Sequence, residues 1–181
     1  MENKLVDSIP AFAATMRLAS FERMKNMSGI KPLFNDIADW DAKIFGPSMS
    51  MITVAGKDLR IFLKVHYRSS LFAGKIPHVT TRKHCEDFFN EFCNLWAGAV
   101  KQSLLLCNVV CGISLPIALP GFDEFIFSDK IRPHRFVDCY AMRIAGAAAV
   151  LTTAVDVNDR ELVKKLSVCN FSEAENEIDF L

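Results

Sequence analysis

The stretch DFFNEFCNLWAGAVKQSLLLCNVVCGISLP, residues 87–116, decides the predicted fold. Its apolar side chains recur at the three- and four-residue intervals of an amphipathic helix, and a run of apolar and β-branched residues then leads to Pro116. Polar residues, Gly or Pro break every apolar run well short of the roughly 20 residues that a bilayer span requires. The stretch therefore predicts a long surface helix, a turn and a strand, with no membrane span.

The polar side chains of this helix lie on one stripe. Asp87, Glu91, Asn94, Gly98 and Lys101 are separated by four, three, four and three residues, the spacing of neighbours on one helix face. A carboxylate can pair with a cation, whereas a carboxamide donates and accepts hydrogen bonds without charge. Gly98 costs about 1 kcal/mol relative to Ala in a helix, which suggests close approach by another backbone. A solvated helix face would show the same stripe, so the spacing alone leaves that alternative open.

The rest of the chain predicts a second long helix. Apolar residues recur at nearly helical spacing over residues 4–25, and Pro10 favours a helix start near Ser8 because proline is tolerated in a first turn. The helix that contains the polar stripe should cover residues 79–106, with Thr80 or Thr81 as its N-cap. Turn-forming residues in 26–48 predict a long connection.

Strands account for most of the remaining segments. Residues 51–54 and 59–67 predict a hairpin, and 109–119, 124–127, 136–144 and 148–155 predict further strands joined by short turns. Short turns between strands favour an antiparallel meander. Residues 160–166 predict a short helix, and 172–181 a frayed acidic tail. The predicted fold is α+β: residues 1–171 form a single domain with two long helices packed on one face of an antiparallel sheet.

Charge and cysteine content limit the classes of partner. Lys and Arg number 21, as do Asp and Glu, so there is no broad basic field for nucleic acid or anionic membrane. A discrete protein or small-molecule partner is expected.

The six cysteines include no CxxC pair and sit mostly among apolar neighbours, which indicates reduced, buried thiols in a cytoplasmic protein.

Two other chemistries are disfavoured by spacing. Cys107 and Cys111, with His78 and His134 elsewhere, lack the paired short spacings of a zinc site, so no metal or cofactor site is predicted in this chain. His84 and Cys85 are helical neighbours and point about 100° apart. That angle argues against a thiolate–imidazolium pair.

The spacing Asp87-x3-Glu91-x2-Asn94-x21-Pro116 resembles the signature of the CheC/CheX/FliY family of chemotaxis phosphatases, with every element in register. Gly98 and the segment ISLPIALPG around Pro116 are also similar to this family. The first helix lacks a second copy of the motif. A Glu173-x2-Asn176 pair is present near the chain end, but position 169 is Cys. The resemblance is therefore to CheX-like members with one site per chain.

This resemblance implies an enzyme that hydrolyses the aspartyl phosphate of a CheY-like response regulator in two-component signalling. Glu91 and Asn94 would be catalytic: Asn94 orients the attacking water, and Glu91 pairs with a lysine of the regulator. Asp87, Gly98 and Pro116 would support docking or shape the site. The regulator supplies Mg²⁺, so this chain would bind no cofactor, and a homodimer is implied. The alternative that stays open is a non-catalytic module that binds a receiver or a flagellar-switch partner.

Overall fold

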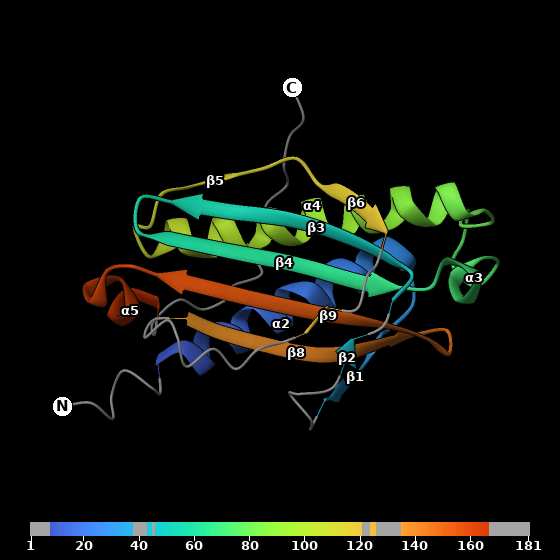
Figure 1. Ribbon diagram of the computed structural model, residues 1–181, viewed down its shortest axis with the longest axis horizontal. Helices are drawn as coiled ribbons and strands as arrows, with labels where there is room; N and C mark the ends of the chain where they lie inside the picture. The colour runs from blue at the N-terminus through green and yellow to red at the C-terminus, as the bar shows by residue number, and fades with distance from the viewer. Residues whose placement is uncertain (1–7, 38–42, 45, 121–123, 126–134, 167–181) are drawn as a thin grey trace.

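An antiparallel sheet forms the centre of the computed structural model, which describes residues 8–37, 43–44, 46–120, 124–125 and 135–166 (Figure 1). The strand order is β1-β8-β9-β4-β3-β5, and β6 also pairs with β3. A separate two-stranded sheet joins β2 and β7. The strands are β1 (Leu33–Asp36), β2 (Lys43–Ile44), β3 (Ser48–Gly56), β4 (Leu59–Tyr67), β5 (Cys111–Ile113), β6 (Ile117–Pro120), β7 (Glu124–Phe125), β8 (Arg135–Ile144) and β9 (Ala147–Val157). The predicted α+β class with an antiparallel sheet is confirmed.

Two hairpins, β3–β4 and β8–β9, lie side by side because β4 pairs with β9. Alternate side chains of β4, including Ile61, Leu63 and Val65, are fully buried, as expected for strands with one face on the core. The predicted hairpin is confirmed. The predicted meander is wrong, because β5 and β6 pair with one edge of the β3–β4 hairpin while β9 pairs with the other. Neighbours along the chain are only usually neighbours in a sheet.

The connection predicted for residues 26–48 contains an edge strand. Leu33 pairs with Arg143 and Asp36 with Tyr140, so β1 extends the sheet beyond β8. β1 has only four residues, and its burial does not alternate. A segment this short and exposed carries no period-2 signal, and its partner strand lies about a hundred residues later in the sequence.

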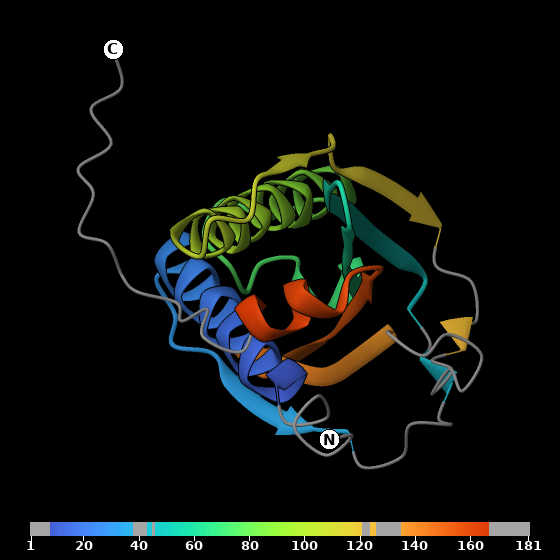
Figure 2. The same ribbon diagram turned by 90° about the vertical axis from the view of Figure 1, so that its left-hand side faces the viewer.

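Four helices accompany the sheet in the described ranges: α2 (Ser8–Ser28), α3 (Ser69–Phe72), α4 (Arg82–Leu106) and α5 (Arg160–Leu166). Figure 2 shows α2, α4 and α5 on the same side of the curved sheet. The helix predicted over residues 4–25 is confirmed for its described part, which begins at Ser8 because residues 1–7 lie outside the described ranges. Thr81 is the N-cap of α4, because its side chain accepts a hydrogen bond from the His84 backbone N–H at 3.1 Å.

Buried aromatic side chains fix the orientation of α4. Trp96 is completely buried, and its Nε1 donates to the backbone carbonyl of Met16 on α2 at 2.9 Å. Phe89 stacks on Tyr67 of β4 with ring centroids 4.1 Å apart. Phe92 stacks on Trp96 at 5.7 Å. These contacts direct one face of the helix to the core and leave the opposite face outward.

Among the described cysteines, one differs from the prediction. Cys107, the C-cap of α4, is disulfide-bonded, so the expectation that every thiol is reduced is wrong there. Sequence spacing cannot show which cysteines the fold brings together. Cys85, Cys93, Cys111 and Cys139 are free and buried. Position 169 and the predicted tail of residues 172–181 lie outside the described residues.

No helix in the described ranges has both the length and the apolar character needed to cross a bilayer.

Candidate functional site

The polar stripe predicted from the sequence lies on the outer face of α4. Asp87, Glu91, Asn94 and Lys101 are exposed, and Gly98 is half-buried. The buried residues of the helix lie on the opposite face and include the aromatic side chains that contact the sheet and α2. The structure therefore brings the predicted motif residues of α4 together on one accessible surface.

Glu91 and Asn94 are available to a partner. Neither side chain has a hydrogen bond or an ion pair with any residue that the structure describes. They are three residues apart, about 4.5 Å along the helix axis, so they point in similar directions. One carboxylate and one carboxamide thus stand next to each other with all of their hydrogen-bonding atoms unused within the described ranges.

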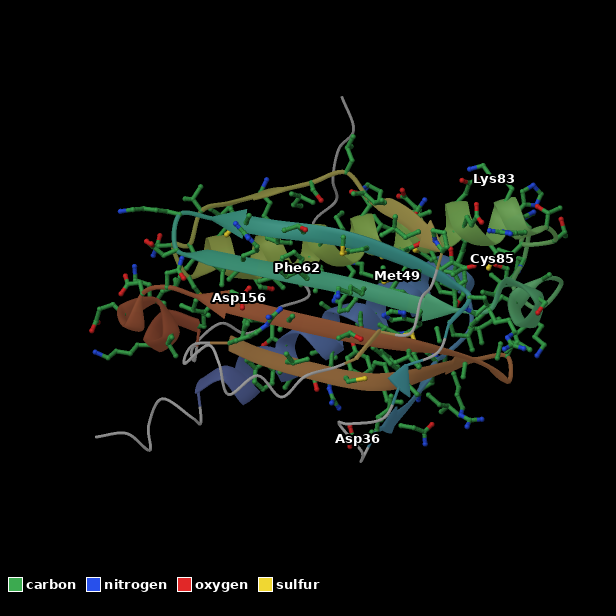
Figure 3. The ribbon with its side chains drawn as sticks, viewed as in Figure 1. Asp36, Met49, Phe62, Lys83, Cys85 and Asp156 are labelled. Carbon is green, nitrogen blue, oxygen red and sulfur yellow. The ribbon has the colours of Figure 1, made fainter. Side chains whose placement is uncertain are left out.

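Asp87, in contrast, is already paired. The Lys83 ammonium donates to Asp87 Oδ1, one turn along the helix, and this hydrogen bond raises the pKa of Lys83. Both side chains are more than half exposed, so the pair adds little stability. Figure 3 shows Lys83 at the start of α4. The pair reduces the charge that Asp87 would present to a partner, and it distinguishes Asp87 from Glu91.

Gly98 leaves open space on the stripe. Apart from its chain neighbours and the adjacent backbone of its own helix, a Cβ added at Gly98 would meet no atom within 4 Å. The close approach suggested by the sequence is therefore not made by any described backbone of this chain. The surface above this helix turn is accessible to another molecule.

Pro116 lies in the short link between β5 and β6. Both strands pair with β3 and contact α4, so the link runs beside the helix (Figure 1). Ser114 holds the link to β3: its backbone N–H donates to Thr53 O at 2.9 Å, and its Oγ accepts from Thr53 N at 3.0 Å. Pro116 has no N–H to donate, which suits a position where the strand ladder is interrupted. Leu115 and Ile117 on either side are 84% and 48% exposed.

Comparison with known proteins adds information about the fold. No protein-family model matches the chain, and no curated protein matches its sequence. The chemotaxis protein CheX from Vibrio vulnificus aligns with a TM-score of 0.59 and 14% identity, over 80% of this chain and 99% of that one. A chain of the CheX–CheY–BeF3–Mg complex from Borrelia burgdorferi aligns at 0.56 and 14%, over 82% and 97%. A chain of the FliM–SpeE complex from H. pylori aligns at 0.56 and 8%, over 93% and 97%.

Structures of a CheC-like protein from Shewanella and of Thermotoga maritima FliY match as well. The chain has the fold that these CheX, CheC-like and FliY structures share. At these identities the likeness concerns the fold. It agrees with the resemblance predicted from the spacing of Asp87, Glu91, Asn94 and Pro116.

Helix α4 also carries a polar residue that the motif did not include. Asn90 is half-buried, and its Oδ1 is a buried acceptor without a hydrogen-bond partner among the described residues. It precedes Glu91 and lies four residues before Asn94, so it borders the stripe. The i,i+4 spacing of two asparagines was the available sequence signal. Burial of one of them could not be read from that spacing.

The two free thiols of α4 are inert. Burial raises the pKa of Cys85 to about 11, and burial also raises the pKa of Cys93. His84 is exposed, and its Nδ1 is 3.0 Å from Thr80 Oγ1. As the helical spacing predicted, His84 and Cys85 occupy different environments, and burial keeps both thiols protonated at neutral pH.

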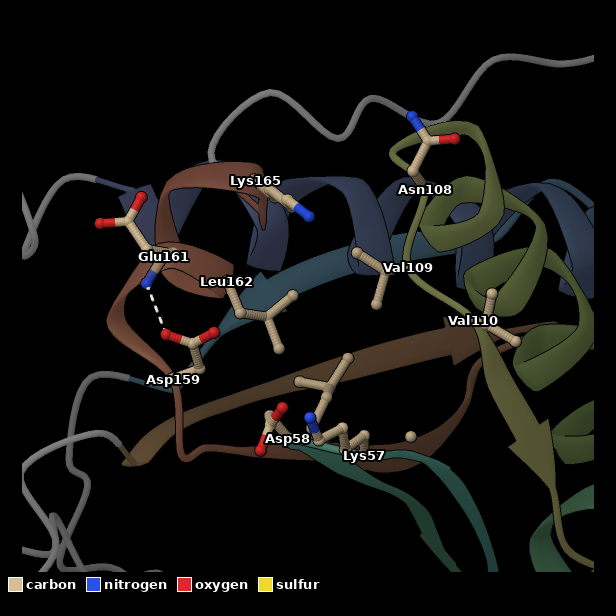
Figure 4. A pocket seen from close by; sticks show the side chains of 11 residues that line it. Lys57, Asp58, Asn108, Val109, Val110, Asp159, Glu161, Leu162 and Lys165 are labelled. Carbon is tan, nitrogen blue, oxygen red and sulfur yellow. Dashed lines mark hydrogen bonds between the residues drawn. The ribbon is translucent and has the colours of Figure 1, made fainter.

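A pocket of about 300 Å³ lies away from the motif in this CheX-like fold. Figure 4 shows that the turn between β3 and β4, the turn after α4, and α5 form it. Its polar lining includes Lys57, Asp58, Asn108, Asp159 and Lys165, and none of the predicted site residues line it. In the described part of the chain, no three His, Cys, Asp or Glu side chains come together as a metal site.

Proposed function

We propose that this chain is a phosphatase that hydrolyses the aspartyl phosphate of a CheY-like response regulator. One observation carries the proposal: the side chains of Glu91 and Asn94 are exposed on the same face of α4. Neither has a hydrogen bond or an ion pair with any described residue of the chain. The pair is then half of an active site, which a partner must complete. The fold shared with a chain of the CheX–CheY–BeF3–Mg complex supports a receiver domain as that partner.

The chemistry suits the residues present. An aspartyl phosphate has a good leaving group, so the helper protein need not supply a strong base and can act by holding a water in line with the phosphorus. Attack by that water forms a new P–O bond and breaks the bond to the aspartyl oxygen. The products are inorganic phosphate and the free carboxylate. Mg²⁺ and a lysine of the regulator would balance the phosphoryl charge.

Each predicted site residue has a distinct part in this proposal. Asn94 orients the water, because a neutral amide is not repelled by phosphoryl oxygens as a carboxylate would be. Glu91 pairs with the lysine of the regulator. Asp87 positions the first turns of α4 for docking, Gly98 admits the partner's backbone, and Pro116 shapes the neighbouring link.

The surrounding assembly belongs to the same proposal. The two long helices, packed on one face of the sheet, form the layer that presents the stripe. The chain acts in the cytoplasm as a homodimer with one site per chain. Sedimentation of the purified protein tests the dimer, and a monomer at micromolar concentration would reject it.

The decisive experiment follows the decay of a phosphorylated CheY-like receiver, with and without this chain. We expect faster decay with the wild-type protein. Asn94→Ala should lower the catalysed rate by roughly 10²- to 10³-fold, the usual loss for one well-placed polar group. Fold and receiver binding should persist, because Asn94 is exposed and has no bond within the described ranges.

Gln102→Ala is the matched control, since it removes an exposed carboxamide two turns further along α4. It should keep the wild-type rate. An Asn94→Ala protein with full activity would overturn the assignment of Asn94.

A second candidate is a non-catalytic module that binds a receiver or a flagellar-switch partner through α4. The likeness to a chain of the FliM–SpeE complex favours it, because that match covers 93% of the present chain. The same assay separates the two functions. Binding to the phosphorylated receiver without faster decay would support the binding module and reject the phosphatase.

A further inference from the structure

We propose that Asn90 positions Asn94 for catalysis: Asn90 Oδ1 accepts a hydrogen bond from Asn94 Nδ2 in the docked complex, which leaves Asn94 Oδ1 facing the attacking water. The inference rests on the proposed phosphatase function and adds a residue to its site. Asn90 lies outside the Asp87, Glu91, Asn94 and Pro116 motif.

The starting observation is the environment of Asn90 Oδ1. This acceptor is buried, yet it has no hydrogen-bond partner among the described residues. Nearly all buried polar atoms in folded proteins are paired, because an unpaired one costs folding free energy. An apolar side chain at position 90 would avoid that cost. The cost therefore has to be offset by a state in which the acceptor is used.

Asn94 is the donor that fits this position best on the helix. Residues four apart are surface neighbours, with Cβ atoms about 5–6 Å apart, and two carboxamides can bridge that gap by rotating their side chains. Asn94 has no hydrogen bond or ion pair with any described residue, so its side chain can rotate without breaking one. The other polar neighbours of Asn90 on adjacent turns, Glu86, Asp87 and Glu91, carry carboxylates, which accept and do not donate when ionised.

The nearby cations are already engaged. Arg82 Nε donates to Glu86 Oε1 at 2.8 Å, and Lys83 donates to Asp87. Neither ion pair includes Asn90. Among the side-chain N–H donors in the described part of α4, the carboxamide of Asn94 is then the unengaged one within one turn of Asn90. The Cys93 thiol is also within one turn, but an S–H group is only a weak donor.

Orientation is the chemical reason for such a bond. A carboxamide has a donating end and an accepting end of nearly equal size. An attacking water must give a hydrogen bond to Asn94 Oδ1 so that its lone pair faces the phosphorus. With Nδ2 held by Asn90, Asn94 presents only the accepting end. Without Asn90, either end could face the water, and part of the bound complexes would be unproductive.

Asn90→Leu tests this inference, because leucine has a similar size and no polar atom. We expect kcat for dephosphorylation of the receiver to fall roughly 10- to 100-fold, the range for a misoriented reacting group, with KM unchanged. The urea midpoint should stay the same or rise, because the unpaired buried acceptor is removed. A purely structural asparagine would instead lower the midpoint and leave kcat per folded molecule unchanged.

Gln102→Leu is the control, since it places the same side chain at an exposed position of α4. It should leave kcat and KM at the wild-type values. In an Asn94→Ala background, Asn90→Leu should lower the rate no further, because Asn90 acts through Asn94.

Two outcomes would overturn the inference. If the wild-type protein is active and Asn90→Leu has the same kcat, the role of Asn90 is rejected and the proposed function stands. A wild-type protein that does not accelerate receiver dephosphorylation rejects both.

Discussion

Arg17 on α2 holds Asp138 on β8 through two parallel hydrogen bonds: Nε donates to Oδ2 and Nη2 to Oδ1, each at 2.6 Å. The Asp138 side chain is 6% exposed and that of Arg17 28%. Arg17 also pairs with Asp36 on β1 and lies 4.7 Å from the ring centroid of Tyr140. The hydrogen bond to Asp138 is the main reason that the pKa of Arg17 is raised. This cluster attaches the first helix to two strands of the sheet.

Asp138→Asn should lower the free energy of unfolding by about 3 kcal/mol, because it leaves the Arg17 charge in a partly buried place without its partner. Urea unfolding measures the change. Asp36→Asn is the control within the same cluster: the Asp36 side chain is 80% exposed, so its pair should contribute at most about 1 kcal/mol. Equal effects of the two substitutions would contradict the importance of burial here.

Gly98→Ala should stabilise the protein by about 1 kcal/mol, because alanine is the better helix former and its Cβ would meet no atom within 4 Å. The same methyl group should raise KM for the phosphorylated receiver if the partner's backbone approaches this turn. A urea titration and a steady-state assay on one preparation measure both effects. Unchanged KM together with higher stability would show that no partner approaches Gly98 closely.

Stability should fall as the pH rises above about 10. Burial raises the pKa of Tyr67 to about 12, whereas the phenol ionises near pH 10 in the unfolded chain. Between these values the unfolded chain has lost a proton that the folded chain retains, so the free energy of unfolding decreases with pH. Urea midpoints at pH 9 and pH 11.5, compared between wild type and Tyr67→Phe, measure the contribution. The same decrease of the urea midpoint in wild type and Tyr67→Phe would show that Tyr67 does not contribute to the pH dependence.

Local sequence patterns predicted the parts of the fold that depend on near neighbours in the chain. The helical period of residues 79–106 predicted α4 and the exposed side of Glu91 and Asn94. The cap at Thr81 and the β3–β4 hairpin also follow from short-range rules. These features are local because helix and hairpin contacts join residues that are close in sequence.

Long-range contacts were decided only by the tertiary structure. β1 and β8 pair although about a hundred residues separate them in the chain. β5 and β6 pair with the β3 edge of the β3–β4 hairpin, whereas β9 pairs with its β4 edge. No local period encodes such partners, because pairing depends on which edges the rest of the chain leaves open.

The candidate site shows the same division. The sequence by itself determined that Asp87, Glu91, Asn94 and Gly98 share one helix face, since a period of 3.6 residues requires it. Only the tertiary structure decided that Asp87 is paired, that Gly98 faces open space, and that Asn90 Oδ1 is buried without a partner. Burial and pairing depend on packing between elements distant in the chain, and that packing is set by the whole fold.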